Sequence, residues 1–257
     1  MNTNHLTLIA LPGIPDVQPG DDVGRLLLAA LDGAGLAPQD GDVIAIAQKI
    51  VSKAEGRLVD LADVEPGERA RELAGQTDKD PRLVELILRE SDEVSRVRPG
   101  VIIVRHRLGF TSANAGIDRS NVETAAGPEE AVLLLPLDPD ASAAALREAL
   151  RAATGATVGV VITDSHGRPF RLGTVGVAIG VAGLPALWDR RGEADRYGYR
   201  LQHTDVGVAD EVAAAAGLLM GQAAEGQPAV LLRGLRLPPI DGRATDLVRP
   251  KDLDLYR

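Results

Sequence analysis

VITDSHGRPFRLG, residues 161–173, leads from an apolar strand into a polar and cationic segment. The strand is predicted over 158–162, and a turn carrying one carboxylate and two hydroxyls is predicted at Thr163–Ser165. Such oxygen groups can hold a hard divalent cation at the end of a strand. Arg168 and Arg171 follow, and arginine can grip a phosphate or carboxylate with two hydrogen bonds. The stretch therefore indicates either a combined metal and anion site or a polar turn with solvated arginines.

Apolar runs and amphipathic stretches alternate on both sides of this segment. Apolar runs of strand length predict extended elements, and apolar residues three or four positions apart predict helices. The apolar runs lie at 6–11, 42–48, 100–106, 131–137, 174–181, 199–206 and 228–235. The predicted helices lie at 22–33, 66–75, 80–91, 140–153 and 209–220, and 110–121 is predicted to be a polar loop.

The chain shows neither a fixed-period repeat nor a long Ser/Gly linker. Its 257 residues suffice for one large domain with a sizeable core or for two small ones. We expect a single domain over 1–257, and the charge-rich helical segment 64–98 is the candidate for a smaller lobe.

The composition is ordinary for a globular chain, with 45% hydrophobic and 25% charged residues. The net charge of −9 argues against a general nucleic-acid binder, which is usually basic. The absence of cysteine excludes a disulfide, a thiolate nucleophile and a zinc–thiolate site. No apolar stretch reaches the roughly 18–20 residues of a membrane span, and no signal-peptide pattern is present. We expect a cytoplasmic protein that binds neither nucleic acid nor membrane.

Aromatic residues are scarce, and most of them gather in one region together with arginines. Phe170, Trp188, Tyr197 and Tyr199 lie within thirty residues of one another, beside Arg171, Arg190, Arg191, Arg196 and Arg200. Planar rings beside guanidinium groups suit a flat anionic ligand. The alternative is that the rings fill a core and the arginines face water.

Four other loops suit ligand binding, and each has a plain structural alternative. Leu11–Ile14 holds a glycine beside stiffening prolines, where backbone N–H groups can approach a ligand. Residues 48–57 carry two lysines and a serine that can bind phosphate, although surface lysines are common. Asp118 offers a second oxygen ligand from a polar loop, where Asp and Asn often form Asx-turns. Residues 220–228 join a helix to a strand through glycines that either admit a ligand or end the helix.

Several common catalytic motifs are absent. The chain has no GxxxxGK[ST] phosphate loop, no GxGxxG after a strand, no HExxH and no GxSxG. Its four histidines are scattered without metal-ligand spacing. His166 alone lies in the central segment, where it is either a ligand-binding or proton-shuttling group or a polar loop residue.

Seven motifs occur in the order seen in one enzyme family. They are ALPGIP (10–15), AQKIVSKAEGR (47–57), NAGIDRSNV (114–122), ITDSHGRPFRLG (162–173), AIGVAGLPAL (178–187), RRGEADRYGYRL (190–201) and VADEVAAAAGLLMGQAAEGQPAVLLRG (208–234). On these residues the chain resembles the coenzyme F-420-0 (F420-0):L-glutamate ligase family. These GTP-dependent enzymes add γ-linked glutamate to a deazaflavin coenzyme.

The resemblance implies a reaction and a fold. GTP would phosphorylate the terminal carboxylate of coenzyme F420-0, the amine of L-glutamate would attack the acyl phosphate, and later rounds would add γ-linked glutamates. Two divalent cations, Mg or Mn, would take part, together with a monovalent cation such as K. The resemblance also implies a homodimer with a mixed α/β (α+β) fold. This family-specific fold has mixed sheets and is neither a P-loop fold nor a Rossmann fold.

The resemblance also assigns site residues by position. Asp118, Asp164, Ser165 and Gln222 match metal-binding positions, although some relatives have glutamate where Gln222 stands, and a neutral amide binds a metal more weakly. The two aspartates are catalytic candidates, and Arg168 joins them on charge and placement rather than on the resemblance. The residues that match GTP contacts are Leu11, Pro12, Gly13, Ile14, Gln48, Lys49, Lys53, Asn121, Met220, Gly221, Gln222, Ala223, Ala224, Glu225, Gly226 and Gln227.

Charge and placement alone add Arg168, Arg171, Arg190 and Arg191 as candidates for binding the anionic groups of the substrate. Only residues 236–257 follow the last motif region, so we expect no C-terminal reductase domain of the kind that some relatives carry.

Two other functions remain open. One is a related ligase that joins another amino acid or another carboxylate through the same acyl-phosphate route. The other is a non-catalytic deazaflavin- or nucleotide-binding protein. The pair Asp118 and Asp164 weighs against a pure binder, which needs no paired metal carboxylates.

Overall fold

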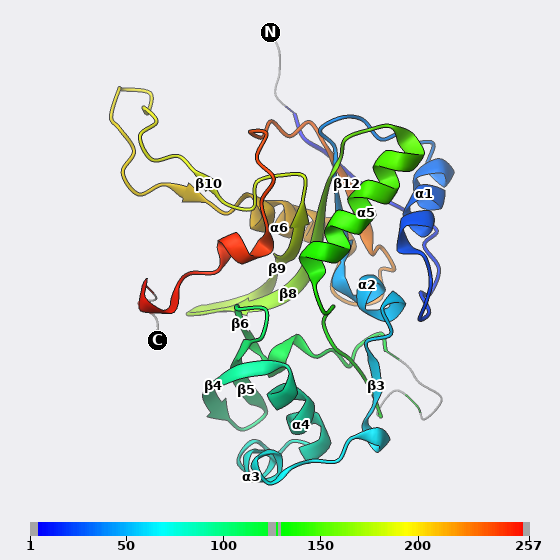
Figure 1. Ribbon diagram of the computed structural model, residues 1–257, viewed down its shortest axis with the longest axis vertical. Helices are drawn as coiled ribbons and strands as arrows, with labels where there is room; N and C mark the ends of the chain where they lie inside the picture. Colours follow the sequence, from blue (N-terminus) through cyan, green and yellow to red (C-terminus); the bar gives the residue numbers. More distant parts are fainter. Residues whose placement is uncertain (1–4, 123–126, 128–129, 254–257) are drawn as a thin grey trace.

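The computed structural model describes residues 5–122, 127 and 130–253. A five-stranded mixed sheet with helices on both faces forms the larger part, and a smaller lobe of helices and strands lies below it in Figure 1. The predicted α+β fold class with mixed sheets is confirmed, and the described strands form no closed barrel. No helix in the described part of the chain is long and apolar enough to cross a membrane.

The central sheet has the strand order β1-β12-β2-β8-β9. Its strands are β1 (Thr7–Ala10), β12 (Ala229–Arg233), β2 (Val43–Ala47), β8 (Gly159–Arg168) and β9 (Arg171–Ala182). β2 and β8 run parallel, whereas the other neighbouring pairs are antiparallel. The parallel register runs from Val43 opposite Gly159 to Ala47 opposite Thr163. The residues that follow β2 therefore emerge beside the polar half of β8.

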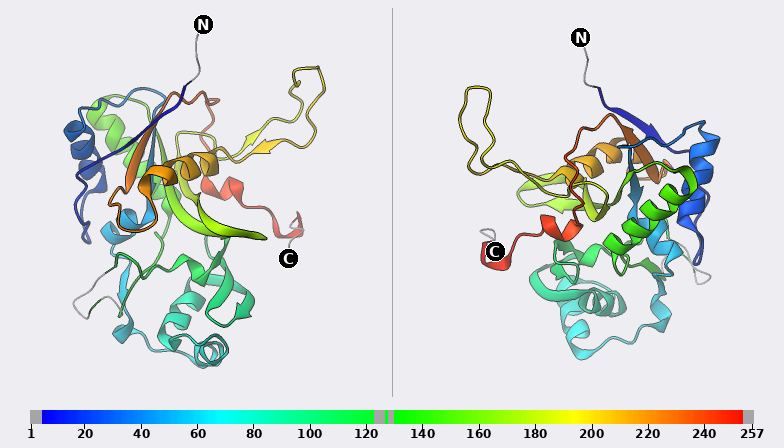
Figure 2. Two further views of the ribbon diagram at one scale, coloured as in Figure 1. Left: turned by 180° about the vertical axis from the view of Figure 1, so that it is seen from behind. Right: turned by 45° about the horizontal axis from the view of Figure 1, so that its top comes forward.

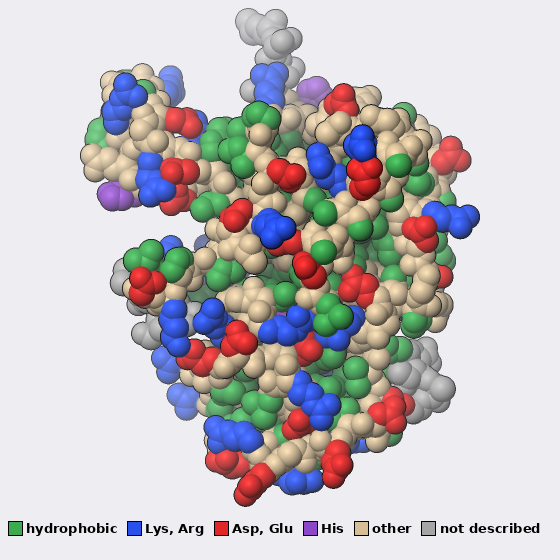
Figure 3. All heavy atoms as spheres, in the orientation of Figure 1, with side chains coloured by type: hydrophobic (Ala, Val, Ile, Leu, Met, Phe, Trp, Pro, Cys, Tyr) green, Lys and Arg blue, Asp and Glu red, His purple; other side chains and the backbone are tan. Residues whose placement is uncertain are grey.

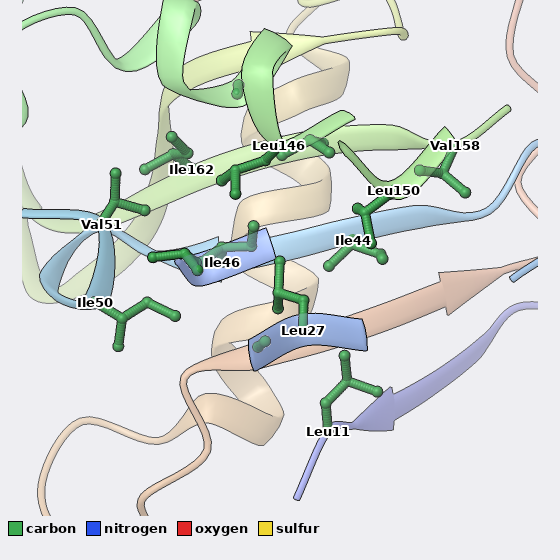
Figure 4. Packing of buried hydrophobic residues seen from close by; sticks show 14 of the residues in the cluster. Leu11, Leu27, Ile44, Ile46, Ile50, Val51, Leu146, Leu150, Val158 and Ile162 are labelled. Carbon is green, nitrogen blue, oxygen red and sulfur yellow. The ribbon is translucent and has the colours of Figure 1, made fainter. Parts of the chain in front are cut away.

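Three helices cover the two faces of this sheet (Figure 1). They are α1 (Val23–Gly33), α5 (Pro139–Thr154) and α6 (Val208–Met220). Ile44 and Ile46 of β2 belong to the cluster that contains buried residues of α1 and α5, as Figure 4 shows. Val43 and Ala45 point to the other side and belong to the cluster with α6. Because both faces are covered, β2 is the continuous apolar run VIAIA rather than an alternating one.

Local capping groups explain where two of these helices begin. The Asp22 side chain accepts a hydrogen bond from the backbone N–H of Arg25, and the Asp138 side chain accepts one from Ala141. Helix α5 ends at Gly155, whose φ of 77° is the left-handed conformation that glycine adopts without strain. The helices predicted at 22–33 and 140–153 are confirmed as α1 and α5.

Two glycines of β9 let helices approach the sheet closely. A Cβ at Gly180 would collide with the backbone carbonyl of Pro139 at the start of α5. A Cβ at Gly176 would collide with the carbonyl of Ala213 in α6. The missing side chains thus set the spacing between β9 and the helices on its two faces.

The smaller lobe has a hydrophobic core of its own. Its main elements are α3 (Glu68–Thr77), α4 (Pro81–Arg89), β4 (Ser91–Arg98), β5 (Val101–His106), β6 (Thr111–Ala113) and 3-10 turns at Leu61–Asp63 and Asn114–Gly116. Leu73 of α3, Val84 of α4 and Ile102 of β5 are buried together in this core. Two strands, β3 (Leu58–Asp60) and β7 (Ala131–Leu133), pair antiparallel and connect the lobe to the larger part. The chain enters the lobe through β3, which follows α2 (Gln48–Ala54).

The central segment differs from its sequence prediction. Thr163–Ser165 form no turn; they lie inside β8, which pairs with β9 as far as Arg168 opposite Arg171. The chain reverses at Pro169–Phe170, where Phe170 has a φ of 58°. Cross-strand backbone hydrogen bonds keep these polar residues extended, and composition alone does not reveal such a partner strand.

Other predicted boundaries also shift. Residues 91–98, placed in a helical segment by their charge, form strand β4 because they pair with β5. The apolar run 131–137 is a strand only as β7. The predicted strand 199–206 shortens to the last two residues, and the loop 110–121 contains β6 and a 3-10 turn.

Residues 188–206 form an arm that projects from the body (Figures 2 and 3). It begins and ends with the two-stranded ribbon β10 (Trp188–Asp189) and β11 (Asp205–Val206). Tyr197 in the arm is 91% exposed, and Phe170 at the tip of the β8–β9 hairpin is 95% exposed. The reading that the clustered rings fill a core is therefore wrong. One ring is engaged by an arginine, because Arg190 lies 4.8 Å above Trp188.

Glu90, at the end of α4, fastens the smaller lobe to the larger part. Arg57 Nη2 donates to Oε1 at 2.9 Å, and Arg107 Nε donates to Oε2 at 3.0 Å. Arg57 also donates to the Leu135 carbonyl, so it bridges both parts of the chain. Burial by itself would raise the pKa of Glu90, but contacts with His106, Arg57 and Arg107 outweigh burial and lower the pKa to about 2.

We expect the ion cluster of Glu90 to govern acid stability. A carboxyl group with a lowered folded-state pKa contributes stability that is present above its unfolded value of 4.5 and is lost as the pH falls through about 2. At about 1.36 kcal/mol per pKa unit, the loss is on the order of 3 kcal/mol. Urea unfolding of the wild type between pH 7 and pH 2 should show this loss, and Glu90→Gln should lack it.

Glu72→Gln is the matched control, since Glu72 forms an exposed ion pair with Arg69. This variant should keep the pH dependence of the wild type. An unchanged pH dependence in Glu90→Gln would contradict the assignment.

Candidate functional site

A pocket of about 500 Å³ opens where β2 ends beside β8. Because Ala47 lies opposite Thr163 in the parallel register, the first residues of α2 and the polar residues of β8 emerge side by side. The loop after α6 and the segment before α1 complete the walls. The lining consists of Ile14–Val17, Ala47–Ile50 and Lys53, Asp118, Ser120 and Asn121, Thr163–Ser165 and Gly176, and Gly217 with Met220–Pro228.

Asp118 is held in the pocket by its backbone and by two side chains, one of which is oriented by a third. Its N–H and C=O bond to Leu133 at 3.0 and 2.9 Å. Gln48 Nε2 donates to Asp118 Oδ2 at 2.6 Å, and Lys49 Nζ lies 2.6 Å from the same oxygen. Ser52 Oγ donates to Gln48 Oε1 at 2.7 Å, so the amide oxygen is occupied and the amide nitrogen turns to the carboxylate. Ser52 and Gln48 thereby position Asp118.

Asp164 comes from β8 and is bonded to a neighbour on its own strand. His166 Nε2 lies 2.9 Å from Asp164 Oδ2, as expected for residues two apart on one face of a strand. The Phe110 ring packs against His166 with centroids 5.0 Å apart. Burial raises the pKa of Asp118; Lys49 opposes this, and the negative charge of Asp164 raises the pKa further.

The oxygen groups of the pocket fit a hard divalent cation. Asp118 and Asp164 hold like charges close enough to repel, and Ser165 and Gln222 add a hydroxyl and an amide oxygen. Among residues 5–122, 127 and 130–253, no three His, Cys, Asp or Glu side chains form a complete metal cluster. Magnesium is commonly held by one or two carboxylates together with phosphate oxygens. The donor set therefore suits a cation that binds together with a phosphate group.

The loop after α6 closes over this pocket with its backbone exposed. The helix ends at Gly221, whose φ is 73°. Asn121 Nδ2 donates to the Ala223 carbonyl at 3.0 Å, which fastens the loop to the segment that carries Asp118. Glu225 Oε2 accepts from the Ala223 N–H at 2.7 Å, and backbone N–H groups lower the pKa of Glu225. The Glu225 carboxylate thus occupies backbone N–H groups of a kind that can also bind phosphate oxygens.

Comparison with known proteins identifies the family. The sequence model of the family described as F420-0:Gamma-glutamyl ligase matches residues 13–234 of this chain. A coenzyme F420:L-glutamate ligase from Methanothermobacter thermautotrophicus is 49% identical over 254 residues, which cover 98% of this chain and 99% of that protein. The chain belongs to the F420-0:gamma-glutamyl ligase family. The family resemblance inferred from seven ordered motifs is thus confirmed.

Further members of the F420-0:gamma-glutamyl ligase family match over nearly the same length. The coenzyme F420:L-glutamate ligase of Methanopyrus kandleri is 48% identical, with 94% of this chain and 93% of that protein covered. The protein of the same name from Haloarcula marismortui is 44% identical, with 98% and 96% covered.

Most residues assigned from the ligase family resemblance lie around the one pocket. All four predicted metal positions, Asp118, Asp164, Ser165 and Gln222, line it. The predicted GTP contacts that line it are Ile14, Gln48, Lys49, Lys53, Asn121, Met220, Gly221, Gln222, Ala223, Ala224, Glu225, Gly226 and Gln227. The fold thus brings together segments from five separate parts of the sequence.

Several predicted residues lie outside the lining of this pocket. Leu11 is fully buried in the core, and Pro12 and Gly13 follow it without lining the pocket. Arg168 lies near the β8–β9 turn, where its Nη2 donates to the Leu172 carbonyl at 3.1 Å. Arg171 is an exposed residue of the same hairpin. Arg190 and Arg191 belong to the arm, where each pairs with a carboxylate at 2.6 Å.

The structure also shows site residues that the sequence prediction missed. Asp16 accepts from Lys53 Nζ at 2.7 Å and so orients that lysine at the rim. Gly176 of β9 lines the pocket opposite Ser165. Ser52, which the sequence offered as a phosphate-binding group, is instead fully buried and donates to Gln48 one helical turn before it.

The carboxylate pair leads to a prediction for the metal-free protein. Replacing Asp164 with asparagine should lower the pKa of Asp118, because a like charge that raises it is removed. Carbon-13 NMR titration of the aspartate carboxyl groups in the presence of a chelator measures this pKa. Asp16→Asn at the pocket rim is the control and should leave the pKa of Asp118 unchanged. A pKa that stays the same in Asp164→Asn would show that the two carboxylates do not interact.

Proposed function

We propose that the protein is a GTP-dependent ligase that joins L-glutamate to coenzyme F420-0 and then adds γ-linked glutamates. The observation that carries the proposal is the pocket in which Asp118 and Asp164 meet beside Lys49, Lys53 and the loop after α6. Carboxylates for a metal, cations and backbone N–H groups are the parts that phosphoryl transfer requires. The relatives are coenzyme F420:L-glutamate ligases, and their names supply the substrates, coenzyme F420 and L-glutamate.

The proposed reaction has two steps. The terminal carboxylate of F420-0 attacks the γ-phosphorus of GTP, the bond to the β-phosphate oxygen breaks, and GDP leaves. The amine nitrogen of L-glutamate then attacks the acyl carbon. The C–O bond to phosphate breaks, inorganic phosphate leaves, and the amine loses a proton as the amide forms. Both steps depend chiefly on holding anionic reactants close together.

The described residues would divide this work. Lys49 and Lys53 are held by Asp118 and Asp16, so their ammonium groups are already at the pocket. Backbone N–H groups near Ala223 would contact phosphate oxygens in place of the Glu225 carboxylate that now accepts from them. Gln48 and Ser52 would keep the Asp118 carboxylate oriented.

Asp118, Asp164, Ser165 and Gln222 would hold magnesium or manganese. Such an ion supplies charge neutralisation for the triphosphate and for the reacting oxygens. Two cations would be compatible with two carboxylates and the phosphate oxygens.

We also propose that the ligase acts as a homodimer. Phe170, Leu172 and Tyr197 are more than 90% exposed, on the β8–β9 hairpin and the arm. Large apolar side chains that stand this far into solvent are typical of surfaces that pack against a partner.

Loss of Asp164 should abolish the reaction. Purified protein with F420-0, L-glutamate, GTP and magnesium or manganese should give products heavier by whole glutamyl units, together with GDP, in a mass-spectrometric assay. Asp164→Asn should lower the rate by about 100-fold or more, since losing one electrostatic contact at the reacting groups costs about 10²–10³. Asp92→Asn, at an exposed position near the start of β4 and outside the pocket lining, should retain full activity.

The same assay separates the alternatives. Turnover with another amino acid in place of glutamate would identify a related ligase. Binding of F420-0 without GDP formation under any of these conditions would identify a non-catalytic binding protein and would reject the proposal.

Removing the divalent cation should stop the reaction at its first step. After treatment with a chelator, neither GDP nor a glutamyl product should form, because the repulsion between carboxylates and triphosphate is no longer neutralised. Adding back manganese should restore both products. GDP formation at an unchanged rate without metal would contradict the assignment of Asp118 and Asp164.

A further inference from the structure

A second and larger pocket, of about 630 Å³, lies along the free edge of β9. The loop between β5 and β6, the start of α5, the first turn of α6 and the 3-10 turn Ala244–Leu247 surround it. No residue of the described chain lines both pockets, so this cavity is distinct from the one that holds Asp118 and Asp164.

The two pockets nevertheless share a wall. His166 lines the second pocket, and its Nε2 lies 2.9 Å from Oδ2 of Asp164, which lines the first. Val177 also lines the second pocket and pairs with Asp164 across the β8–β9 hairpin. A ligand that contacts His166 in the second pocket would therefore lie one side chain away from Asp164, the carboxylate assigned to metal and phosphate.

The acidic side chains of the second pocket are engaged by backbone groups. Asp210 Oδ1 accepts from the Ala178 N–H at 2.8 Å, and Asp140 Oδ1 accepts from the Val181 N–H at 2.8 Å. These carboxylates satisfy donors on the unpaired edge of β9, which would otherwise be open to another strand. Asp138 caps α5. The acids thus have structural roles that account for their presence.

Of the three arginines that line this pocket, one forms an ion pair with a described carboxylate and two do not. Arg107 is bound to Glu90. Arg243 and Arg249 are exposed at the rim, and neither guanidinium forms an ion pair with any described carboxylate. Two guanidinium groups at the rim without an ion pair can bind an anionic group of a ligand, while the carboxylates, which keep their charge, are turned to backbone N–H groups.

One side of the pocket is apolar and carries a fixed aromatic ring. Phe110 lies between His106, stacked at 5.1 Å, and His166 at 5.0 Å. Leu108, Leu247 and Val248 also line the pocket. A fixed ring beside aliphatic side chains suits a flat aromatic group.

We propose that this second pocket binds the acceptor substrate, an aromatic ring system that carries a phosphodiester and a terminal carboxylate. The ring system lies against Phe110 and its aliphatic neighbours, the phosphodiester meets Arg243 and Arg249, and the carboxylate reaches the wall formed by His166 and Asp164. This inference rests on the proposed function, which makes F420-0 the acceptor. The new element is the place where the acceptor binds, together with Arg243 and Arg249 as the residues that recognise its negative charge.

The test uses the full chain with both rim arginines neutralised, Arg243→Gln/Arg249→Gln. Titration of the deazaflavin fluorescence without GTP measures the Kd for F420-0 directly. The Kd should rise about tenfold or more, since charge-assisted hydrogen bonds to the phosphodiester are lost. The KM for F420-0 should rise in parallel, while the KM values for GTP and L-glutamate stay within twofold.

The matched control removes two other exposed arginines without ion pairs, Arg25→Gln/Arg236→Gln, and should keep the wild-type Kd. A deazaflavin that lacks the phosphodiester and carboxylate should bind the wild type and the rim variant alike. The variant Arg243→Lys/Arg249→Lys should recover part of the affinity. Thermal melting should confirm that all variants are folded.

The outcomes separate the pocket from the function. Wild-type turnover with an unchanged Kd and KM for F420-0 in the rim variant would overturn the pocket assignment and leave the ligase proposal standing. Arginine-dependent binding of F420-0 without any glutamyl product would support the pocket and overturn the ligase proposal. Absence of both binding and turnover in the wild type would overturn both.

Discussion

The parallel pairing of β2 with β8 is the constraint on which the site depends. Its register places Ala47 opposite Thr163. The start of α2, after Ala47, therefore lies beside Asp164 and Ser165, which follow Thr163 in β8. A shift by one residue would send the side chains of β8 to the opposite faces and remove Asp164 from the pocket. Burial of both faces under helices fixes this register, because apolar residues of β2 enter both clusters.

The two carboxylates of the pocket come from different parts of the molecule. Asp164 belongs to the central sheet, whereas Asp118 follows the smaller lobe and is anchored by its backbone bonds to Leu133. Their separation is therefore set by how the lobe is attached. The ion cluster of Glu90, with Arg57 from the segment after α2, fixes that attachment near the site.

Glu90, which joins the two parts of the chain, and Asp118, which lines the pocket, lie in opposite electrostatic environments. Cationic groups around Glu90 hold its pKa at about 2, so the carboxylate stays ionised and its negative charge is balanced by Arg57 and Arg107. Asp118 has a raised pKa because burial and the negative charge of Asp164 outweigh the lowering effect of the Lys49 ammonium group. A carboxylate kept under repulsion in a cleft is a better candidate for binding a cation than one that is already neutralised.

By itself the sequence determined the helices and strands with strong periodicity, such as α1, α5, α6 and β2, and the loop after α6 that carries Gln222. Local patterns suffice there, because capping residues and the spacing of apolar side chains act within a few residues. Only the tertiary structure decided that residues 163–168 are extended, that the rings of the arm lie in solvent, and that His166 joins two pockets. Those features depend on which strand lies alongside and on which segments meet across long sequence distances, and neither is encoded in a local pattern.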